Sequence, residues 1–271
     1  MRLSNWKKHI VSFLFFASAT IAYIVYFSSN YLCVPTEHAI YKIRKPQNDT
    51  LRIAFIGDSW ASMHGFHDCQ IGYHIETALK RPAIVKSYGI SGATSKKIYE
   101  KLFDEKSLKS FLSNGFDYCI LSAGINDTNL KMYPTYFIES MDKILCFLTT
   151  NNIWPIIIEI PDYDIEGDYK VSKFHRKLQR WITMHITGTR IDCKQQFRDS
   201  LTHFLKRSPY NNKFSIINYK EWNGNYSNDL KLLYQKDGTH LNQIGYAKLD
   251  SCITRHIITL EQKENNETLE K

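Results

Sequence analysis

Three side chains in this sequence could together carry out nucleophilic acyl chemistry: Ser59, Asp237 and His240. A serine hydroxyl is a weak nucleophile and needs a base within hydrogen-bond reach. Histidine suits that task near neutral pH, and a carboxylate beside it fixes the imidazole tautomer. Asp237 and His240 belong to one Asp-x-x-His segment, so both can face the same site. These residue types therefore indicate a serine-histidine-aspartate triad.

Acyl chemistry also needs hydrogen-bond donors for the oxyanion that forms on the attacked carbonyl. The backbone N–H groups of Ser59 and Gly92 and the side-chain amide of Asn126 could supply three donors. Glycine at position 92 would let the backbone approach a substrate closely. We therefore expect these three residues to form an oxyanion hole.

The elements that must position these residues alternate between strands and helices. Hydrophobic patterning predicts strands at residues 51–56, 83–91, 116–124, 154–160 and 214–219, and helices at residues 94–113, 134–149, 171–187, 192–206 and from 241 onward. Such alternation predicts one α/β domain with a parallel sheet covered on both faces. Ser59, Gly92 and Asn126 each follow a predicted strand, so they should meet at the carboxyl edge of the sheet, within reach of Asp237 and His240.

Four segments in this order resemble the sequence blocks of the SGNH hydrolases, also called the GDSL lipase/esterase family. They are Gly57-Asp58-Ser59, Gly92, Gly124-Ile125-Asn126-Asp127 and Asp237-Gly238-Thr239-His240. The resemblance covers residues 51–260 and implies a flavodoxin-like, three-layer α/β/α fold with about five parallel strands. It implies ester hydrolysis with Ser59 as nucleophile, His240 as base and Asp237 as its orienting group. It also implies an oxyanion hole formed by Ser59, Gly92 and Asn126.

Two positions depart from the family pattern. Trp60 stands where leucine is usual, which places a large ring next to the nucleophile in sequence and leaves the size of the acyl group open. Leu241 stands where proline is frequent.

A competing serine, Ser91, lies in Gly-Ile-Ser-Gly-Ala, a pattern that α/β-hydrolases use for their nucleophile. It could act with His240 as the base and Asp162 as the acid. That alternative leaves the positions of the other blocks unexplained.

Several polar residues near the blocks have structural interpretations. We expect Asp58 to shape the turn before Ser59 without a catalytic part, and Asp127 to be a buried structural carboxylate or a helix cap. Three histidines near the serine, namely His64, His67 and His74, are expected to be polar surface or helix residues.

The amino-terminal region carries a second signal. Residues 10–27 contain no charged residue, and Arg2, Lys7 and Lys8 precede them. This pattern predicts a membrane anchor within residues 1–29, with a cleaved signal sequence as the alternative. The basic flank favours a catalytic domain outside the cytoplasmic membrane, in the periplasm or on the surface of a bacterium. The sequon at Asn126 agrees with a bacterial origin, because a glycan there would block an oxyanion donor.

The remaining organisation and composition are ordinary. Residues 30–50 are expected to be a polar linker and residues 261–271 a flexible charged tail. The formal net charge of +8 is spread along 271 residues without a long basic run, so we expect no nucleic-acid partner. No cysteine or histidine cluster has metal-ligand spacing, so no metal or cofactor is expected. Neither the pairing of the six cysteines nor the oligomeric state can be inferred from the sequence.

Three classes of function fit these observations. The first is a membrane-anchored esterase that removes short acyl groups, such as O-acetyl, from a carbohydrate. A lipase or lysophospholipase-type esterase is an alternative within this class. The second class is an acyltransferase that uses the same triad to move an acyl group onto a glycan hydroxyl. The third is a non-catalytic protein that binds glycans through its aromatic residues, which are 14% of the chain. An intact triad argues against the third class.

Overall fold

A computed structural model of the chain describes residues 5–27, 41–46, 48–65 and 70–269. Its centre is one sheet of five strands: β1 (Leu51–Gly57), β2 (Ala83–Gly89), β3 (Tyr118–Ser122), β4 (Trp154–Ile158) and β5 (Ser215–Ile217). All neighbouring strands are parallel and lie in the order β2-β1-β3-β4-β5. The five predicted strands are thereby confirmed. Because the chain moves from β1 to β2 on one side and then to β3 on the other, the strand order reverses at β1, where parallel sheets bind ligands.

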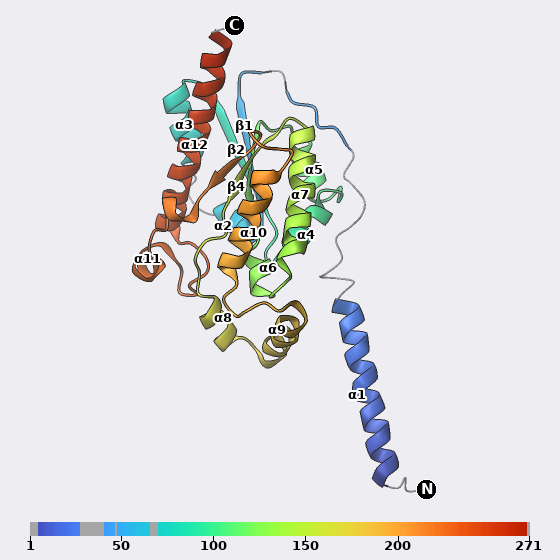
Figure 1. Cartoon of the computed structure of the whole chain (residues 1–271). Helices are drawn as coiled ribbons and strands as arrows, with labels where there is room; N and C mark the ends of the chain where they lie inside the picture. The colour runs from blue at the N-terminus through green and yellow to red at the C-terminus, as the bar shows by residue number, and fades with distance from the viewer. Residues whose placement is uncertain (1–4, 28–40, 47, 66–69, 270–271) are drawn as a thin grey trace.

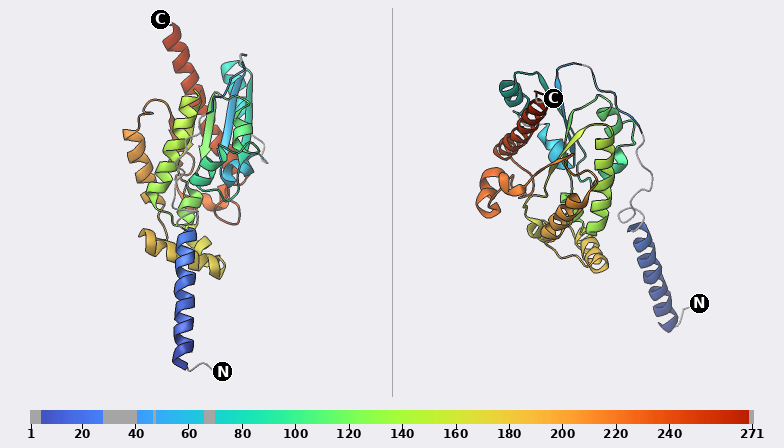
Figure 2. Two further views of the ribbon diagram at one scale, coloured as in Figure 1. Left: turned by 90° about the vertical axis from the view of Figure 1, so that its right-hand side faces the viewer. Right: turned by 45° about the horizontal axis from the view of Figure 1, so that its top comes forward.

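Helices cover both faces of this sheet (Figure 1). α3 and α12 pack together on one face, where α12 also contacts β5, and α4, α7 and α10 form the opposite layer, where α7 contacts β4. The left view of Figure 2 shows α7 and α10 on one side of the strands. The helices of the body are α2 (Ser59–His64), α3 (Ile71–Leu79), α4 (Ser95–Lys101), α5 (Leu108–Leu112), α6 (Ile125–Asn129), α7 (Pro134–Thr150), α8 (Ile165–Val171), α9 (Phe174–Thr187), α10 (Lys194–Arg207), the 3-10 helix η2 (Tyr219–Glu221), α11 (Tyr226–Leu233) and α12 (Gln243–Leu269).

The core lies between the sheet and these two layers. β1 and β3 are almost wholly buried, as their continuous apolar runs require when both faces of a parallel sheet are covered. Trp60, Trp222 and Tyr246 are among the largest fully buried side chains, and they cluster beside the carboxyl end of β1. The expected three-layer α/β/α fold is therefore present.

One predicted helix is divided into two, and another begins later than expected. The helix expected over residues 94–113 ends at Lys101, because Asp104 accepts a hydrogen bond from the N–H of Lys106 at 2.9 Å and so competes with the helical ladder. The helix expected over residues 171–187 begins only at Phe174, as α9, because the backbones of Ser172 and Lys173 are extended. The helices α2, α3, α6, α8 and α11 were not expected from the sequence.

The boundaries of the body also differ from expectation. Residues 261–269, expected to be a flexible tail, continue α12, and the Glu261 carboxylate accepts hydrogen bonds from Tyr118 and Arg81, both at 2.8 Å. At the other end, Ile43 in the expected linker donates its N–H to Asn151 at 2.8 Å. Residues of the expected linker and of the expected tail therefore both contact the α/β body.

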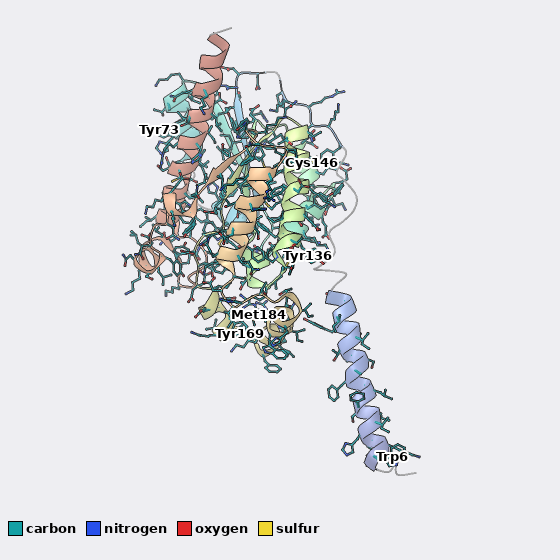
Figure 3. The ribbon with its side chains drawn as sticks, in the orientation of Figure 1. Trp6, Tyr73, Tyr136, Cys146, Tyr169 and Met184 are labelled. Carbon is teal, nitrogen blue, oxygen red and sulfur yellow. The ribbon has the colours of Figure 1, made fainter. Side chains whose placement is uncertain are left out.

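The amino-terminal helix α1 (Asn5–Phe27) projects from the body in both figures. Trp6 lies near its far end (Figure 3). Within the described part of the chain, no helix combines the length and the apolar character that a membrane crossing requires. The membrane-spanning helix expected over residues 10–27 is therefore not supported.

Of the six cysteines, Cys119, Cys146, Cys193 and Cys252 lie within the described residues, and all four are free thiols. Cys119, Cys193 and Cys252 are buried, which raises the pKa of each thiol. They act as small core residues. Cys33 and Cys69 lie outside the described residues.

Candidate active site

The turn from β1 into α2 presents Ser59 at the carboxyl edge of the sheet. Gly57 has a φ of +150°, and a Cβ there would lie 2.1 Å from the carbonyl oxygen of Ser122 on β3, so only glycine fits. Asp58 then caps α2 by accepting a hydrogen bond from the N–H of Trp60 at 3.0 Å. Ser59 is consequently the first residue of a helix that starts directly after a buried strand.

The Asp-x-x-His segment forms a tight loop between α11 and α12. The chain on either side is joined by an antiparallel bridge between Tyr234 and Leu241 and by a 2.7 Å hydrogen bond from the N–H of Gln235 to the carbonyl oxygen of His240. Within the loop, Asp237 Oδ1 accepts hydrogen bonds from the N–H of Thr239 at 2.9 Å and of His240 at 3.0 Å. The second carboxylate oxygen of Asp237 is left for the imidazole.

The structure brings Ser59, His240 and Asp237 into one hydrogen-bonded chain. The distance from His240 Nε2 to Ser59 Oγ is 2.8 Å, and the distance from His240 Nδ1 to Asp237 Oδ2 is 2.6 Å. Because the carboxylate can only accept, Nδ1 carries the proton and Nε2 is free to accept the serine proton. This is the geometry of a nucleophile, a base and an orienting group.

The electrostatics of Asp237 match an orienting role. Partial burial works to raise the pKa of Asp237, but the hydrogen bonds from the His240 side chain and from two backbone N–H groups outweigh it and hold the pKa below its ordinary value. The carboxylate therefore stays ionised at neutral pH and can stabilise an imidazolium.

Each of the three donors expected to form the oxyanion hole has a hydrogen available for a ligand. Within the described chain, the backbone N–H groups of Ser59 and Gly92 donate to no protein acceptor. The Asn126 side-chain amide donates one hydrogen to the carbonyl oxygen of Ala93 at 2.9 Å, which leaves its second hydrogen for a ligand. Gly92 has a φ of +73° and is exposed, so glycine suits this position.

Asp127 holds the glycine loop against α6. Its two carboxylate oxygens accept hydrogen bonds from the hydroxyl of Ser95 at 2.6 Å and from the N–H of Ser95 at 2.9 Å. Because Asp127 is fully buried, its pKa is raised to about 6. Together with the Asn126–Ala93 bond, this contact joins the β3–α6 turn to the loop of Gly92. Asp127 is thus the structural carboxylate that its position indicated.

Asp58 has a similar structural part beneath the nucleophile. Its Oδ1 accepts hydrogen bonds from the Ser122 hydroxyl at 2.7 Å and from the N–H of Trp60, while Oδ2 is buried without a hydrogen-bond partner. Complete burial raises the pKa of Asp58 to about 6. The side chain faces the interior under the turn and shapes it.

The competing serine is not part of this arrangement. Ser91 is exposed in the turn after β2, and the imidazole of His240 is bonded to Ser59 instead. Asp162, the acid that Ser91 would need, forms an ion pair with Arg198 at 2.7 Å. The geometry therefore selects Ser59.

Some contacts around the site were missed by sequence reasoning. His64 was expected to be a polar surface or helix residue, but its ring is buried at the end of α2 and lies 2.7 Å from Asp250 Oδ1 and 3.0 Å from Ser87 Oγ. His74 is exposed on α3, and His67 lies outside the described residues. The partner Asp250 lies almost two hundred positions away on α12, so no local signal could have identified it.

Trp60 does not narrow the acyl site. Its indole is fully buried against Trp222 and Tyr246 and is not among the residues that line the cavity beside Gly92 and Asn126, and its N–H donates to the carbonyl oxygen of Thr239 at 3.2 Å. Leu241 is also fully buried, so its apolar side chain serves the core where proline is frequent in the family.

Solved structures with the same fold are hydrolases. A psychrotrophic esterase, EstA, from Pseudoalteromonas is 14% identical, with a TM-score of 0.52 over 79% of this chain and 100% of that chain. An acetyl xylan esterase is 16% identical, with a TM-score of 0.51 over 76% and 100% of the two chains. A GDSL-like lipase from Bacteroides thetaiotaomicron is 15% identical, with a TM-score of 0.50 over 77% and 88%. The chain thus has the fold of the SGNH/GDSL hydrolases. No protein-family model matches the chain, and no curated protein matches it by sequence.

Proposed function

We propose that this chain is a serine ester hydrolase that removes short acyl groups, such as acetyl, from a carbohydrate. The observation that carries the proposal is the unbroken chain of hydrogen bonds from Ser59 Oγ through His240 to Asp237, at 2.8 and 2.6 Å. The likeness to esterases and acylhydrolases supports the reaction class.

In this proposal Ser59 Oγ attacks the ester carbonyl while His240 Nε2 takes the serine proton. The oxyanion that forms receives hydrogen bonds from the N–H groups of Ser59 and Gly92 and from the second amide hydrogen of Asn126. The imidazolium, stabilised by Asp237, then protonates the departing alcohol and leaves an acyl-serine. Water, deprotonated by the same imidazole, releases the acid and restores Ser59.

The solvent exposure of Asp237 and His240 favours hydrolysis over acyl transfer. The Asp237 side chain is 47% exposed and that of His240 is 21% exposed. Transfer to a sugar hydroxyl requires that water be kept from the acyl-enzyme, and an exposed imidazole works against that requirement.

A polar alcohol group is favoured over a long acyl chain by the cavity beside the oxyanion donors. Gly92 and Asn126 form part of its wall, and most of its other lining residues are polar or charged. A lipase needs a continuous apolar surface for its substrate. The cavity instead fits a hydroxyl-rich molecule such as a sugar.

Placement of the domain outside the cytoplasmic membrane is also a proposal. It is supported by the uncharged residues 10–27 and the basic residues before them. Fractionation of cells into soluble and membrane parts, with protease added to intact spheroplasts, tests it, since a protein that remains protected inside the cells would contradict it.

The full-length protein, purified and assayed on 4-nitrophenyl acetate, 4-nitrophenyl octanoate and acetylated sugars, tests the reaction and the substrate class. We expect the acetyl esters to be hydrolysed well and the octanoate poorly. Hydrolysis of the octanoate alone would favour a lipase, and inertness toward all of these esters would refute the proposal.

A further inference from the structure

The cavity beside the candidate oxyanion hole has a specific lining. Its volume is about 520 Å³, which is suitable for a small ligand. The β2–α4 loop, α4 and α6 form one wall, α8 and α9 form the other, and Tyr26 at the end of α1 also lines the cavity. In Figure 3, the labelled residues Tyr169 and Met184 mark the positions of α8 and α9. Figure 1 shows that α6 lies at the same end of the body. Because Gly92 and Asn126 belong to the first wall, a group held in this cavity lies next to the ester carbonyl.

Positive charge exceeds negative charge in this lining. Four cationic side chains and two carboxylates line the cavity, which leaves a formal excess of two positive charges: Lys96, Lys97, Arg176 and Arg180 against Glu100 and Asp168. Like charges are costly to hold together in a partly enclosed space unless a ligand compensates them.

The two carboxylates are already engaged by three of the cations. Asp168 pairs with Arg180 at 2.7 Å. Glu100 serves both lysines, Lys97 at 3.3 Å and Lys96 at 3.8 Å. Arg176 forms no hydrogen bond or ion pair with any residue that the structure describes. Its guanidinium is therefore the cation available to an incoming anion.

The surroundings strengthen such an interaction. Arg176 itself is exposed, but Lys96 is 6% exposed and Arg180 is 5% exposed, so the charges of these two neighbours are screened less by solvent than those of surface residues. A guanidinium also matches a carboxylate in geometry, since it can donate two parallel hydrogen bonds.

We propose that the cavity is a subsite for an acidic sugar, in which Arg176 binds the carboxylate of that sugar. The inference rests on the proposed ester hydrolysis at Ser59, because the acetyl group of that sugar would be the one removed. It narrows the substrate from carbohydrate esters in general to esters of uronic or similarly anionic sugars.

The test uses the full-length protein and a matched pair of substrates, acetylated glucuronic acid and glucose carrying acetyl at the same position. We expect kcat/KM to be at least about tenfold higher for the acidic sugar at low ionic strength, with the preference falling as salt is added. Arg176→Gln should reduce this preference by about fivefold to tenfold, mainly through KM for the acidic sugar. Arg207→Gln is the matched control, because Arg207 ends α10 away from this cavity and its loss removes the same charge.

Two outcomes would overturn the inference: equal kcat/KM for the two sugars, or equal effects of the Arg176 and Arg207 substitutions. Calorimetric titration with glucuronate and glucose separates the subsite from the reaction. If no ester is hydrolysed but glucuronate binds and the Arg176→Gln protein does not bind it, the proposed function fails and the subsite stands. If esters are hydrolysed without any Arg176-dependent selectivity or binding, the proposed function stands and the subsite fails.

Discussion

The indole N–H of Trp60 donates a hydrogen bond to the carbonyl oxygen of Thr239, 3.2 Å away. Trp60 follows the candidate nucleophile in sequence, and Thr239 precedes the candidate base. The bond thus joins the backbone segments that carry Ser59 and His240, which come from opposite ends of the domain. The residue that departs from the family pattern therefore fixes the separation of two functional groups.

Trp60→Phe should lower kcat more than it changes KM, because the loop of His240 loses this connection while the cavity is untouched. The smaller ring and the lost hydrogen bond should also destabilise the fold by ~1–3 kcal/mol. Trp222→Phe is the control, since Trp222 is equally buried and its indole N–H has no hydrogen-bond partner. Steady-state kinetics and thermal unfolding check both variants, and an identical loss of kcat in the two would contradict the positioning role.

Ser59→Ala should abolish labelling by a serine-directed fluorophosphonate and leave the fold intact, because only one hydroxyl is lost. Ser91→Ala should retain labelling and most of the activity. In-gel detection of the labelled protein, together with circular dichroism, measures both effects. Labelling that disappears with Ser91 and survives without Ser59 would assign the nucleophile to the other serine.

Asp237→Asn should reduce kcat by roughly 10²–10⁴, because the amide no longer stabilises the imidazolium or fixes its tautomer. The pKa of Asp237 is held below its ordinary value, so its ionisation should affect stability only as the pH falls into the acid range. Steady-state kinetics of the Asp237→Asn protein test this assignment, and a near-normal kcat would contradict it.

Asn126→Ala should slow turnover by roughly 10²–10³, the usual loss for one oxyanion donor, while fluorophosphonate labelling of Ser59 continues. The same substitution frees the carbonyl oxygen of Ala93, so the loop of Gly92 should also become less ordered. Single-turnover kinetics measure the chemical step directly.

Asp58→Asn and Asp127→Asn should affect stability in opposite directions. Both pKa values are raised to about 6 by burial, so the folded state binds more protons than the unfolded state, and stability falls as pH rises from the ordinary aspartate value to about 6. Asparagine at 58 keeps the acceptor oxygen used by Ser122 and Trp60 and removes the buried charge, so the melting temperature at pH 7 should hold or rise.

The Asp127→Asn substitution instead replaces one of the two carboxylate oxygens, both of which accept hydrogen bonds from Ser95, with an NH₂ group. The melting temperature of this variant should therefore fall. Thermal unfolding of both variants between pH 4 and 8 provides the measurement. If the Asp58→Asn protein unfolds at a clearly lower temperature than the unmodified protein at pH 7, the electrostatic account of this residue is wrong.

The sequence by itself determined the sheet and the positions of the candidate site. The buried apolar runs of β1 and β3, the Gly57 turn and the Asp-x-x-His segment are local patterns, and strand-helix alternation leaves one way to bring their ends together. Ser59, Asp237 and His240 were found because each has a residue type and a place along the chain that the chemistry requires.

The tertiary structure decided what depends on contacts between distant segments. Three such contacts join residues more than one hundred positions apart. They are the contact of His64 with Asp250, the hydrogen bond from Tyr118 to Glu261 on α12, and the hydrogen bond from Trp60 to Thr239. The availability of Arg176 was also decided there, because its sequence neighbours do not show that Asp168 is engaged by Arg180. Spacing along a chain specifies periodicity and turns, whereas pairing of charges and burial depend on which side chains packing brings together.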